Sequence, residues 1–295
     1  MVTRTSLTTM PNTELIFVSG KGGTGKSAVA AALAIDRARR GNSVLAIDMG
    51  TSLGLGAHLR EPELQYAPTE VRPGLFAMSM DRATALDEYL KLQLRVPQGA
   101  PTGQLSSALA VLADTAPGVR EIISIGKPVY EAWNGRWDTV VVDAPSLGQF
   151  QSYLRAPSTI ADLVPTGNVK NQAARLQETL LDPNTTRIVL VTTPAELPVN
   201  ETLEAVEAIT VEDLSPPPTI VINRLLEPIG IDHARLADVP AGAALDAATL
   251  QLELEDEQDE WVDAIDYDVT LPFLRGVLTP GEVAVQLADT IGARR

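Results

Sequence analysis

Residues 20–27, with the sequence GKGGTGKS, have the types and the spacing needed to hold a phosphate group. They match the pattern G-x-x-x-x-G-K-[ST], in which glycines let the backbone turn tightly and aim N–H groups at one point. In this pattern the last lysine, Lys26, reaches the β and γ phosphates, and the hydroxyl of Ser27 meets Mg²⁺. We therefore expect ATP or ADP to bind with Mg²⁺ through Gly20, Lys21, Gly22, Gly23, Thr24, Gly25, Lys26, Ser27 and Ala28.

A strand before this loop and a helix after it must position the N–H groups. Residues 15–18 are apolar throughout and residues 28–40 are rich in alanine, so the order is strand, loop and helix. The start of that helix adds its positive dipole end to the anion site. Residues 43–47 then form a second short apolar strand. A glycine-rich turn before an ordinary helix is the alternative, but it does not account for Lys26 and Ser27 at the required positions.

A later apolar strand, residues 137–142, runs into Asp143. An aspartate in this place supports the water shell of Mg²⁺, because Mg²⁺ keeps several waters and uses few protein carboxylates. An aspartate that ends a strand is also common as a turn or helix cap. Its position after a phosphate loop in the chain order favours the metal role, so we predict that Ser27 and Asp143 hold Mg²⁺.

The remaining strands predict the fold and the place of the base. Residues 187–192 and 219–222 are apolar throughout, as expected for strands that are covered on both faces. Asn223 follows the second of these strands and could bind adenine, although a capping role suits its residue type equally well. The order of the motifs along the chain favours the adenine-binding role for Asn223. Further strands are expected at 75–80 and 268–271, and Pro272 and Phe273 after the last one are further candidates for the nucleotide site.

These segments predict an α/β fold with three layers, typical of P-loop NTPases, in which helices flank a mostly parallel central sheet. Residues 1–13 are expected to be a flexible tail and 14–295 a single domain. The expected irregular and helical parts are a glycine-rich loop at 50–56, a short helical insert at about 82–135, an acidic loop or solvated face at about 250–262 and a closing helix at 280–293. The insert would contain a helix at 82–95 with Leu86, Leu90 and Leu94, a second marked by Leu105, Leu109 and Leu112, and a third from 117 toward Trp133.

Composition narrows the function further. The net charge of −15 disfavours nucleic acid as the main partner, because phosphate backbones are bound by clustered Lys and Arg. The chain has no cysteine, and its two histidines, His58 and His233, cannot make a zinc site alone. No apolar run approaches the roughly 20 residues of a membrane helix, and the start lacks the apolar core of a secretory signal. We therefore expect a cytoplasmic protein with no integral membrane segment.

The second lysine of the loop, Lys21, makes the motif more specific. The sequence resembles the deviant Walker A signature, which is found in dimeric ATPases. With residues 143–149, 192–200, 221–224 and 271–273, the chain resembles the arsenical-pump and tail-anchored-protein-targeting ATPase family over most of its length. The resemblance implies that Lys21 crosses a dimer interface to the partner's nucleotide, whereas a solvated loop lysine is the alternative.

The departures from this family concern the chemistry. Aligned without gaps from Val44, Gly50 falls where the family has the aspartate that positions the attacking water. A shifted alignment would give that role to Asp48, which could otherwise support Mg²⁺. Lys21, Lys26 and Asp48 are therefore the candidate catalytic residues. Leu147 and Gln149 stand where the family usually has Thr and His, and no cysteine pair can bind zinc between subunits.

The resemblance implies a nucleotide-gated ATPase dimer, formed with a second copy or with a paralogous subunit, and the missing carboxylate at Gly50 predicts that it hydrolyses ATP slowly. A non-hydrolysing, nucleotide-bound scaffold for an active paralogue is the second hypothesis. A membrane-associated regulator is the third, but residues 280–295 have only Arg294 and Arg295 as basic residues. The leucines of the insert could bind a small hydrophobic client or a partner helix, although packing in the core is favoured.

Overall fold

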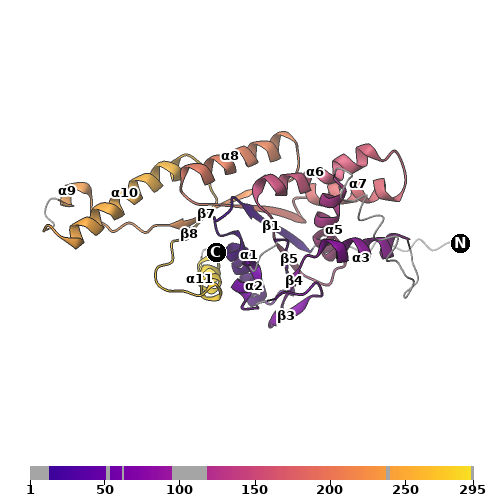
Figure 1. Ribbon diagram of the computed structural model, residues 1–295, viewed down its shortest axis with the longest axis horizontal. Coiled ribbons are helices and arrows are strands. Elements are labelled where there is room, and N and C mark those ends of the chain that lie inside the picture. Colours follow the sequence, from indigo (N-terminus) through magenta and orange to yellow (C-terminus); the bar gives the residue numbers. More distant parts are fainter. Residues whose placement is uncertain (1–12, 51–53, 62, 95–117, 237–239, 294–295) are drawn as a thin grey trace.

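The computed structural model describes residues 13–50, 54–61, 63–94, 118–236 and 240–293 (Figure 1). The expected helix with Leu105, Leu109 and Leu112 lies outside these residues, as does the N-terminal tail apart from Thr13. Thr13 is buried and donates its hydroxyl to the carbonyl of Trp137 at 2.7 Å. The folded part therefore includes a residue that the sequence assigned to the tail.

A central sheet of eight strands organises the chain. Their order in the sheet is β3-β4-β2-β5-β1-β6-β7-β8, and every neighbouring pair is parallel except β3 and β4. The strands are β1 (Glu14–Gly20), β2 (Val44–Asp48), β3 (Thr69–Arg72), β4 (Leu75–Ser79), β5 (Thr139–Asp143), β6 (Thr186–Thr192), β7 (Thr219–Leu225) and β8 (Val269–Pro272). The predicted mostly parallel sheet is confirmed.

Helices cover both faces of the sheet and make the three layers (Figure 1). One layer contains α1 (Lys26–Arg39), α2 (Gly54–Leu59) and α11 (Pro280–Ala293), and the other contains α5 (Val119–Trp133), α6 (Leu147–Leu163), α7 (Asn168–Leu181) and α8 (Glu196–Val211). Three more helices lie toward the ends of the sheet: α3 (Arg82–Leu94), α9 (His233–Leu236) and α10 (Ala243–Asp263). None of the helices in the described ranges combines the length and apolar character that a membrane span requires.

Alternation along the strands builds a core on each face. Leu15 and Phe17 of β1 pack in the core under α5, α6 and α8, whereas Ile16 and Val18 pack in the core under α1 and α11. The face of α1 toward this second core is made mostly of alanine, and it lies on the sheet without exposed apolar area. Its buried apolar residues are Ala28, Val29, Ala30, Ala31, Ala32, Ala34 and Ile35.

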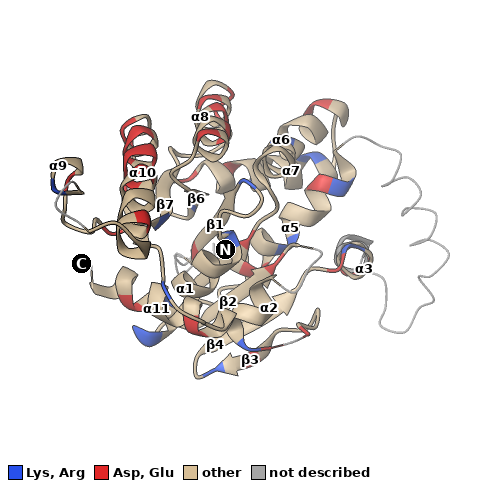
Figure 2. Cartoon of the chain, turned by 60° about the vertical axis from the view of Figure 1, so that its left-hand side comes forward, with Lys and Arg blue, Asp and Glu red and all other residues tan. Residues whose placement is uncertain are grey.

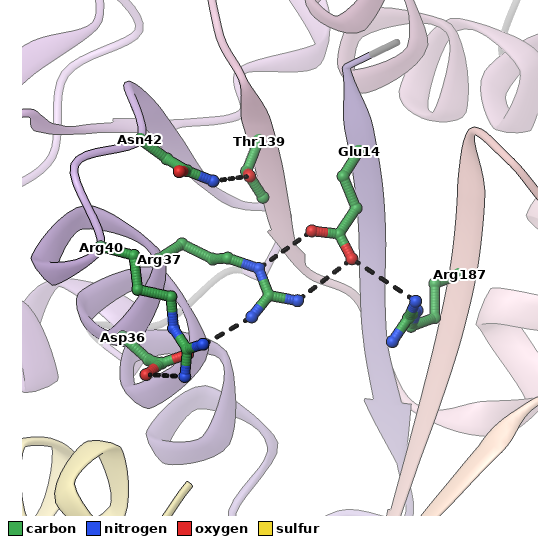
Figure 3. A network of polar contacts seen from close by, with 7 residues as sticks. All are labelled: Glu14, Asp36, Arg37, Arg40, Asn42, Thr139 and Arg187. Atoms are coloured by element: carbon green, nitrogen blue, oxygen red, sulfur yellow. Dashed lines mark hydrogen bonds and ion pairs between the residues drawn. The ribbon is translucent and has the colours of Figure 1, made fainter. Parts of the chain in front are cut away.

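The far end of α1 is tied to the start of β1 by ion pairs (Figure 3). Arg37 donates to both carboxylate oxygens of Glu14, from Nε at 2.9 Å and from Nη2 at 3.1 Å. Arg40 holds Asp36 with two further hydrogen bonds, of 2.9 and 2.8 Å. Bidentate pairs of this kind fix direction as well as distance. They hold the helix at the end opposite the phosphate loop.

The predicted helical insert is part of the main body. Helices α3 and α5 confirm two of its three expected helices, and Leu86 of α3 is buried, as core packing requires. Buried Lys127 of α5 joins the two helices, with its ammonium 2.8 Å from Glu88 of α3 and 2.7 Å from Glu131 of α5. The side chains of Leu90 and Leu94 lie outside the described part of the structure.

The expectation of an acidic loop at 250–262 is wrong. This stretch belongs to α10, a helix of 21 residues that projects past the β7–β8 edge of the sheet (Figure 1). Its Ala, Leu, Glu and Gln residues are strong helix formers, and this outweighs repulsion between its acids. Gln258 accepts from the N–H of Leu226 at 2.7 Å, and Glu255 accepts from the N–H of Ile229 at 3.0 Å. These polar contacts anchor the helix along the segment that follows β7.

Three smaller differences concern regular structure that the sequence did not reveal. Part of the glycine-rich stretch 50–56 is helical, since α2 begins at Gly54. Residues 192–200, which follow the expected strand at 187–192, contain the start of α8 at Glu196. The short antiparallel edge strand β3 was not expected, because its sequence, TEVR, is polar and only partly buried.

Candidate nucleotide-binding site

The glycine-rich loop lies between β1 and α1, at the carboxyl end of the sheet. Two of its glycines are required by close approaches. Gly20 has φ +156°, and a Cβ there would lie 2.1 Å from the carbonyl oxygen of Val191. Gly25 has φ +93°, and a Cβ there would lie 2.4 Å from Nδ2 of Asn223. The loop therefore packs closely against β6 and β7 near the carboxyl ends of these strands.

The loop is held in shape by the carbonyl group of Lys21. This oxygen accepts from the hydroxyl of Thr24 at 2.9 Å and from the ammonium of Lys26 at 3.2 Å. Burial lowers the pKa of Lys26, and the nearby carboxylate of Asp143 opposes this shift. Lys26 thus has a partly buried cation whose hydrogen-bond partner is a neutral carbonyl, so an anion in the loop would be a stronger partner.

The predicted metal residues are brought together beside Lys26. The hydroxyl of Ser27 hydrogen-bonds to the carboxylate of Asp143, which is buried at the end of β5. Asp48, at the end of β2, lies opposite Asp143 in the parallel ladder. Its carboxylate accepts from the N–H of Gly50 at 2.7 Å. The site therefore has two carboxylates and a hydroxyl, all hard oxygen ligands.

The acidity of the two carboxyl groups reflects the same arrangement. Burial raises the pKa of Asp143 to about 7, with a further contribution from Asp48, while Ser27 and Lys26 act in the opposite direction. Burial also raises the pKa of Asp48, against hydrogen bonds from the N–H groups of Gly50 and Leu55. A divalent cation would relieve this cost, because it favours the charged form of both groups.

These residues fit Mg²⁺ better than a metal that needs a full protein cage. In the described part of the chain no group of three or more His, Asp or Glu side chains is gathered as a metal site. Mg²⁺ needs few protein ligands because it keeps several waters and also binds phosphate oxygens. The histidines lie apart: Nδ1 of His58 is 2.6 Å from the carbonyl of Gly54, and Nε2 of His233 is 2.7 Å from Asp256.

Two cavities meet at Lys26 and Ser27. The first, of about 440 Å³, lies between the loop and β8, in the size range of small-molecule sites. Its lining includes Asn223, the predicted adenine-binding residue, together with Ala28, Pro272 and Phe273, which were predicted for the nucleotide site in general. Asn223 is buried and donates from Nδ2 to the carbonyl of Thr24 at 2.8 Å. It therefore fixes the loop from the side of the first cavity, an interaction that residue type and chain order did not predict.

The second cavity, of about 860 Å³, lies on the side of Asp48, Gly50 and Asp143. Sequence reasoning did not name Glu63 and Asp81 of its lining, and it named Gln149 only as a departure from the family pattern. Asp81 lies just beyond the end of β4, and the rule that sites form at the carboxyl ends of parallel strands could have indicated it. Gln149 lies in the first turn of α6 and donates from Nε2 to the hydroxyl of Tyr153 at 2.9 Å.

Lys21 does not line either cavity. Its side chain forms an ion pair with Glu201 of α8 in the same chain. Its carbonyl faces the loop while its ammonium lies at the surface, where the side chain is 28% exposed. The predicted catalytic residues therefore divide into two groups: Lys26 and Asp48 border the second cavity, and Lys21 lies outside it.

Comparison with known proteins agrees with this geometry. The model of the anion-transporting ATPase family matches residues 13–172. The chain is 32% identical to ATPase BagA of Mycobacterium tuberculosis over 249 residues, which cover 77% of this chain and 71% of the relative. It is 28% identical to ATPase GET3 of Chaetomium globosum over 200 residues, covering 66% and 56%. ATPase ARSA2 of Chlamydomonas reinhardtii is 30% identical over 149 residues, covering 49% and 38%.

The family match covers the loop, both strand-end aspartates and the whole of α6, and the fold has the layers and strand order described above. The resemblance inferred from the loop and the later strands is thus confirmed. By its sequence, its fold and its relatives, the chain is a member of the anion-transporting ATPase family, with an α/β fold of the P-loop NTPase type.

Proposed function

We propose that this protein is a cytoplasmic, dimeric ATPase that binds Mg²⁺ with ATP or ADP and hydrolyses ATP slowly. The observation that carries the proposal is the position of Lys26 and Ser27 between the two cavities. A nucleotide whose base lies in the first cavity would place its terminal phosphates beside both residues and the buried pair Asp48 and Asp143. The partly buried Lys26 cation is suited to that charge.

Each part of the nucleotide has a proposed partner. The loop N–H groups and Lys26 bind the phosphates, and Ser27 and Asp143 hold Mg²⁺, which when bound would neutralise charge on the phosphates. Asn223, Pro272 and Phe273 border the base. The amide of Asn223 already donates to Thr24, so its remaining hydrogen-bonding groups are those proposed for adenine.

Slow ATP hydrolysis follows from the residues of the second cavity that would have to position the attacking water. Gly50 has no side chain to orient a water, and the carboxylate of Asp48 is engaged by the N–H groups of Gly50 and Leu55. Phosphoryl transfer depends mainly on positioning and charge stabilisation, so Lys26 and the loop still support some hydrolysis. A positioned base typically contributes ~10²- to 10⁴-fold, which is the size of the expected deficit.

The same residues support a second candidate, a non-hydrolysing scaffold that pairs with an active paralogous subunit. In that case the chain binds nucleotide and stabilises the pair, and the paralogue provides the chemistry. A hydrophobic client or partner helix remains a proposal for the leucines of the insert. It does not include Leu86, which is buried.

One experiment separates these candidates. ATP binding is measured by calorimetry, mass by sedimentation and phosphate release by a coupled assay, all with and without Mg²⁺. The proposed function expects Mg²⁺-dependent binding, a mass that doubles with ATP, and slow release of phosphate. A chain that binds ATP and releases phosphate only when a paralogue is added supports the scaffold, and a chain that binds no nucleotide contradicts both.

A further inference from the structure

The ion pair between Lys21 and Glu201 joins residues that are 180 positions apart in the sequence. It is possible because β1 and β6 are neighbours, with Gly20 opposite Val191 in the ladder. The loop therefore leaves β1 next to the point where β6 leads into α8. Glu201 lies in the second turn of that helix, and its carboxylate pairs with the Lys21 ammonium.

The surface around this ion pair is open. Extra Cβ atoms at Gly22 and Gly23 would meet no atom within 4 Å. Leu197, one helical turn before Glu201, is 63% exposed although it is a large apolar residue. Figure 2 shows further acidic residues along α8, so the ammonium of Lys21 lies at the edge of an acidic helix. An open rim with an apolar residue and a cation suits the docking of a second chain.

We propose that Glu201 is a positioning residue for Lys21: it holds the ammonium on its own chain and gives it up to the nucleotide phosphates of a second copy when two chains meet. This inference rests on the dimeric function proposed above. One ammonium cannot pair fully with Glu201 and with a phosphate across an interface, so the two contacts compete. Each cis ion pair therefore opposes association until a phosphate is present to replace the carboxylate.

The relative strengths of the two contacts allow this exchange. The Lys21 and Glu201 side chains are 28% and 43% exposed, so water and salt screen their attraction. Exposed ion pairs of this kind change an equilibrium by about 1.5- to 5-fold. Polyphosphate has more negative charge, and an interface excludes water, so the phosphate contact is the stronger one. The Glu201 carboxylate therefore orients the Lys21 ammonium weakly enough for a phosphate to displace it.

The test uses variants that differ in one contact. Glu201→Gln removes the charge of the carboxylate and keeps its shape, and Glu201→Asp keeps the charge. Glu207→Gln is the matched control, because Glu207 is an exposed acid on the same helix and the change in net charge is identical. Lys21→Ala removes the cation and thus both competing contacts.

The first measurement needs neither nucleotide nor dimer. The chain has only five lysines, so reductive methylation with ¹³C gives a simple NMR spectrum in which Lys21→Arg identifies the Lys21 signal. We expect that signal to move in Glu201→Gln, to stay in Glu207→Gln and to be restored toward the wild-type position in Glu201→Asp. A Lys21 signal that is unaffected by Glu201→Gln overturns the contact.

The second measurement is association of the unmodified proteins with saturating Mg²⁺-ATP, by sedimentation. A symmetric dimer breaks two cis ion pairs, so Glu201→Gln should lower the dissociation constant by roughly 2- to 25-fold, whereas Lys21→Ala should raise it. Unchanged or weaker association of Glu201→Gln, with a dimeric wild type, overturns the exchange alone. Wild type and Glu201→Gln that bind Mg²⁺-ATP and stay monomeric overturn the dimeric function, and the exchange with it.

Discussion

Asp48 and Asp143 lie directly opposite each other in the parallel ladder of β2 and β5, and both are buried, with 4% and 6% of their surface exposed. Neighbouring strands are about 4.8 Å apart, so two acids that face one cavity from these positions repel each other when both are ionised. Burial is the larger reason why the pKa of Asp143 is raised to about 7. The fold holds an unfavourable pair of charges that a cation would relieve.

The pH dependence of stability should reveal this pair. The pKa of Asp143 is about 7 in the folded chain and about 4 when unfolded, so between these values the folded state holds a proton that the unfolded state has lost. Stability from this group is therefore present below pH ~4 and is lost as pH rises toward 7. Asp143→Asn should raise the melting temperature at pH 8 by several degrees and change it little at pH 4.

Addition of Mg²⁺ provides the control for that prediction. If Asp143 holds the ion, Mg²⁺ should raise the melting temperature of the wild type at pH 8 and have little effect on Asp143→Asn. Calorimetric scans at both pH values, with and without Mg²⁺, give the four comparisons needed. An Asn variant with the same shift at pH 4 and pH 8 would show that the carboxyl group does not titrate in this range.

Removal of the Lys26 side chain should abolish ATP binding. Lys26→Ala takes away the partly buried cation of the proposed phosphate site, and each lost charge-assisted hydrogen bond costs about 1.5–3 kcal/mol. Lys21→Ala should keep most of the nucleotide affinity, because the Lys21 ammonium lies at Glu201 and not in the linings of the two cavities. Calorimetry of both variants is the measurement, and an equal loss of affinity would place Lys21 in the site of its own chain.

Two substitutions near the end of β2 should have opposite effects on turnover. Gly50→Asp puts a carboxylate at the position proposed to orient the attacking water, and phosphate release should increase by up to ~10²-fold. Asp48→Asn should weaken the Mg²⁺ dependence of ATP binding more than it changes a slow rate. Robust hydrolysis by the wild type that is lost in Asp48→Asn, with ATP affinity intact, would instead assign the catalytic role to Asp48.

The ion pairs in Figure 3 should matter more for stability than an exposed ion pair on the same helix. Arg37→Met breaks a bidentate contact with Glu14 in which the Arg37 side chain is only 8% exposed. We expect a loss of about 1.5–3 kcal/mol in the free energy of unfolding, measured with urea. Arg39→Met is the control, because its ion pair with Asp289 is 46% and 63% exposed and should contribute under ~1 kcal/mol.

The parts of the fold that were predicted correctly are those encoded locally. A glycine-rich loop between an apolar strand and an alanine-rich helix specifies its own geometry, and the apolar strands gave the sheet because both of its faces are covered. Helix α10 was not predicted, because two local signals in its sequence disagree. Its run of acids favoured a solvated surface or a loop, whereas the high helix propensity of its Ala, Leu, Glu and Gln residues stabilises a long helix.

The contacts that shape the site connect distant segments, and no local pattern could predict them. Asn223 reaches the loop at Thr24 only because β7 lies next to β6 in the sheet. Glu201 meets Lys21 because α8 starts beside the end of β1. The sequence marked Lys21 and Asn223 only as candidate residues of the nucleotide site. It offered no basis for choosing their partners among the many acids and carbonyl groups of the chain.

The alanines of α1 set how far that helix stands from the sheet. Side chains that end at Cβ let two backbones approach closely, so the first turn of the helix lies low over the strand ends where Asp48 and Asp143 emerge. The ion pair between Arg37 and Glu14 fixes the opposite end of the helix, so the thin alanine layer determines the height of the whole helix above the sheet. Larger residues in place of Ala30, Ala31 or Ala34 would raise the helix from the sheet and move the phosphate loop away from the two aspartates, although none of these alanines belongs to the site.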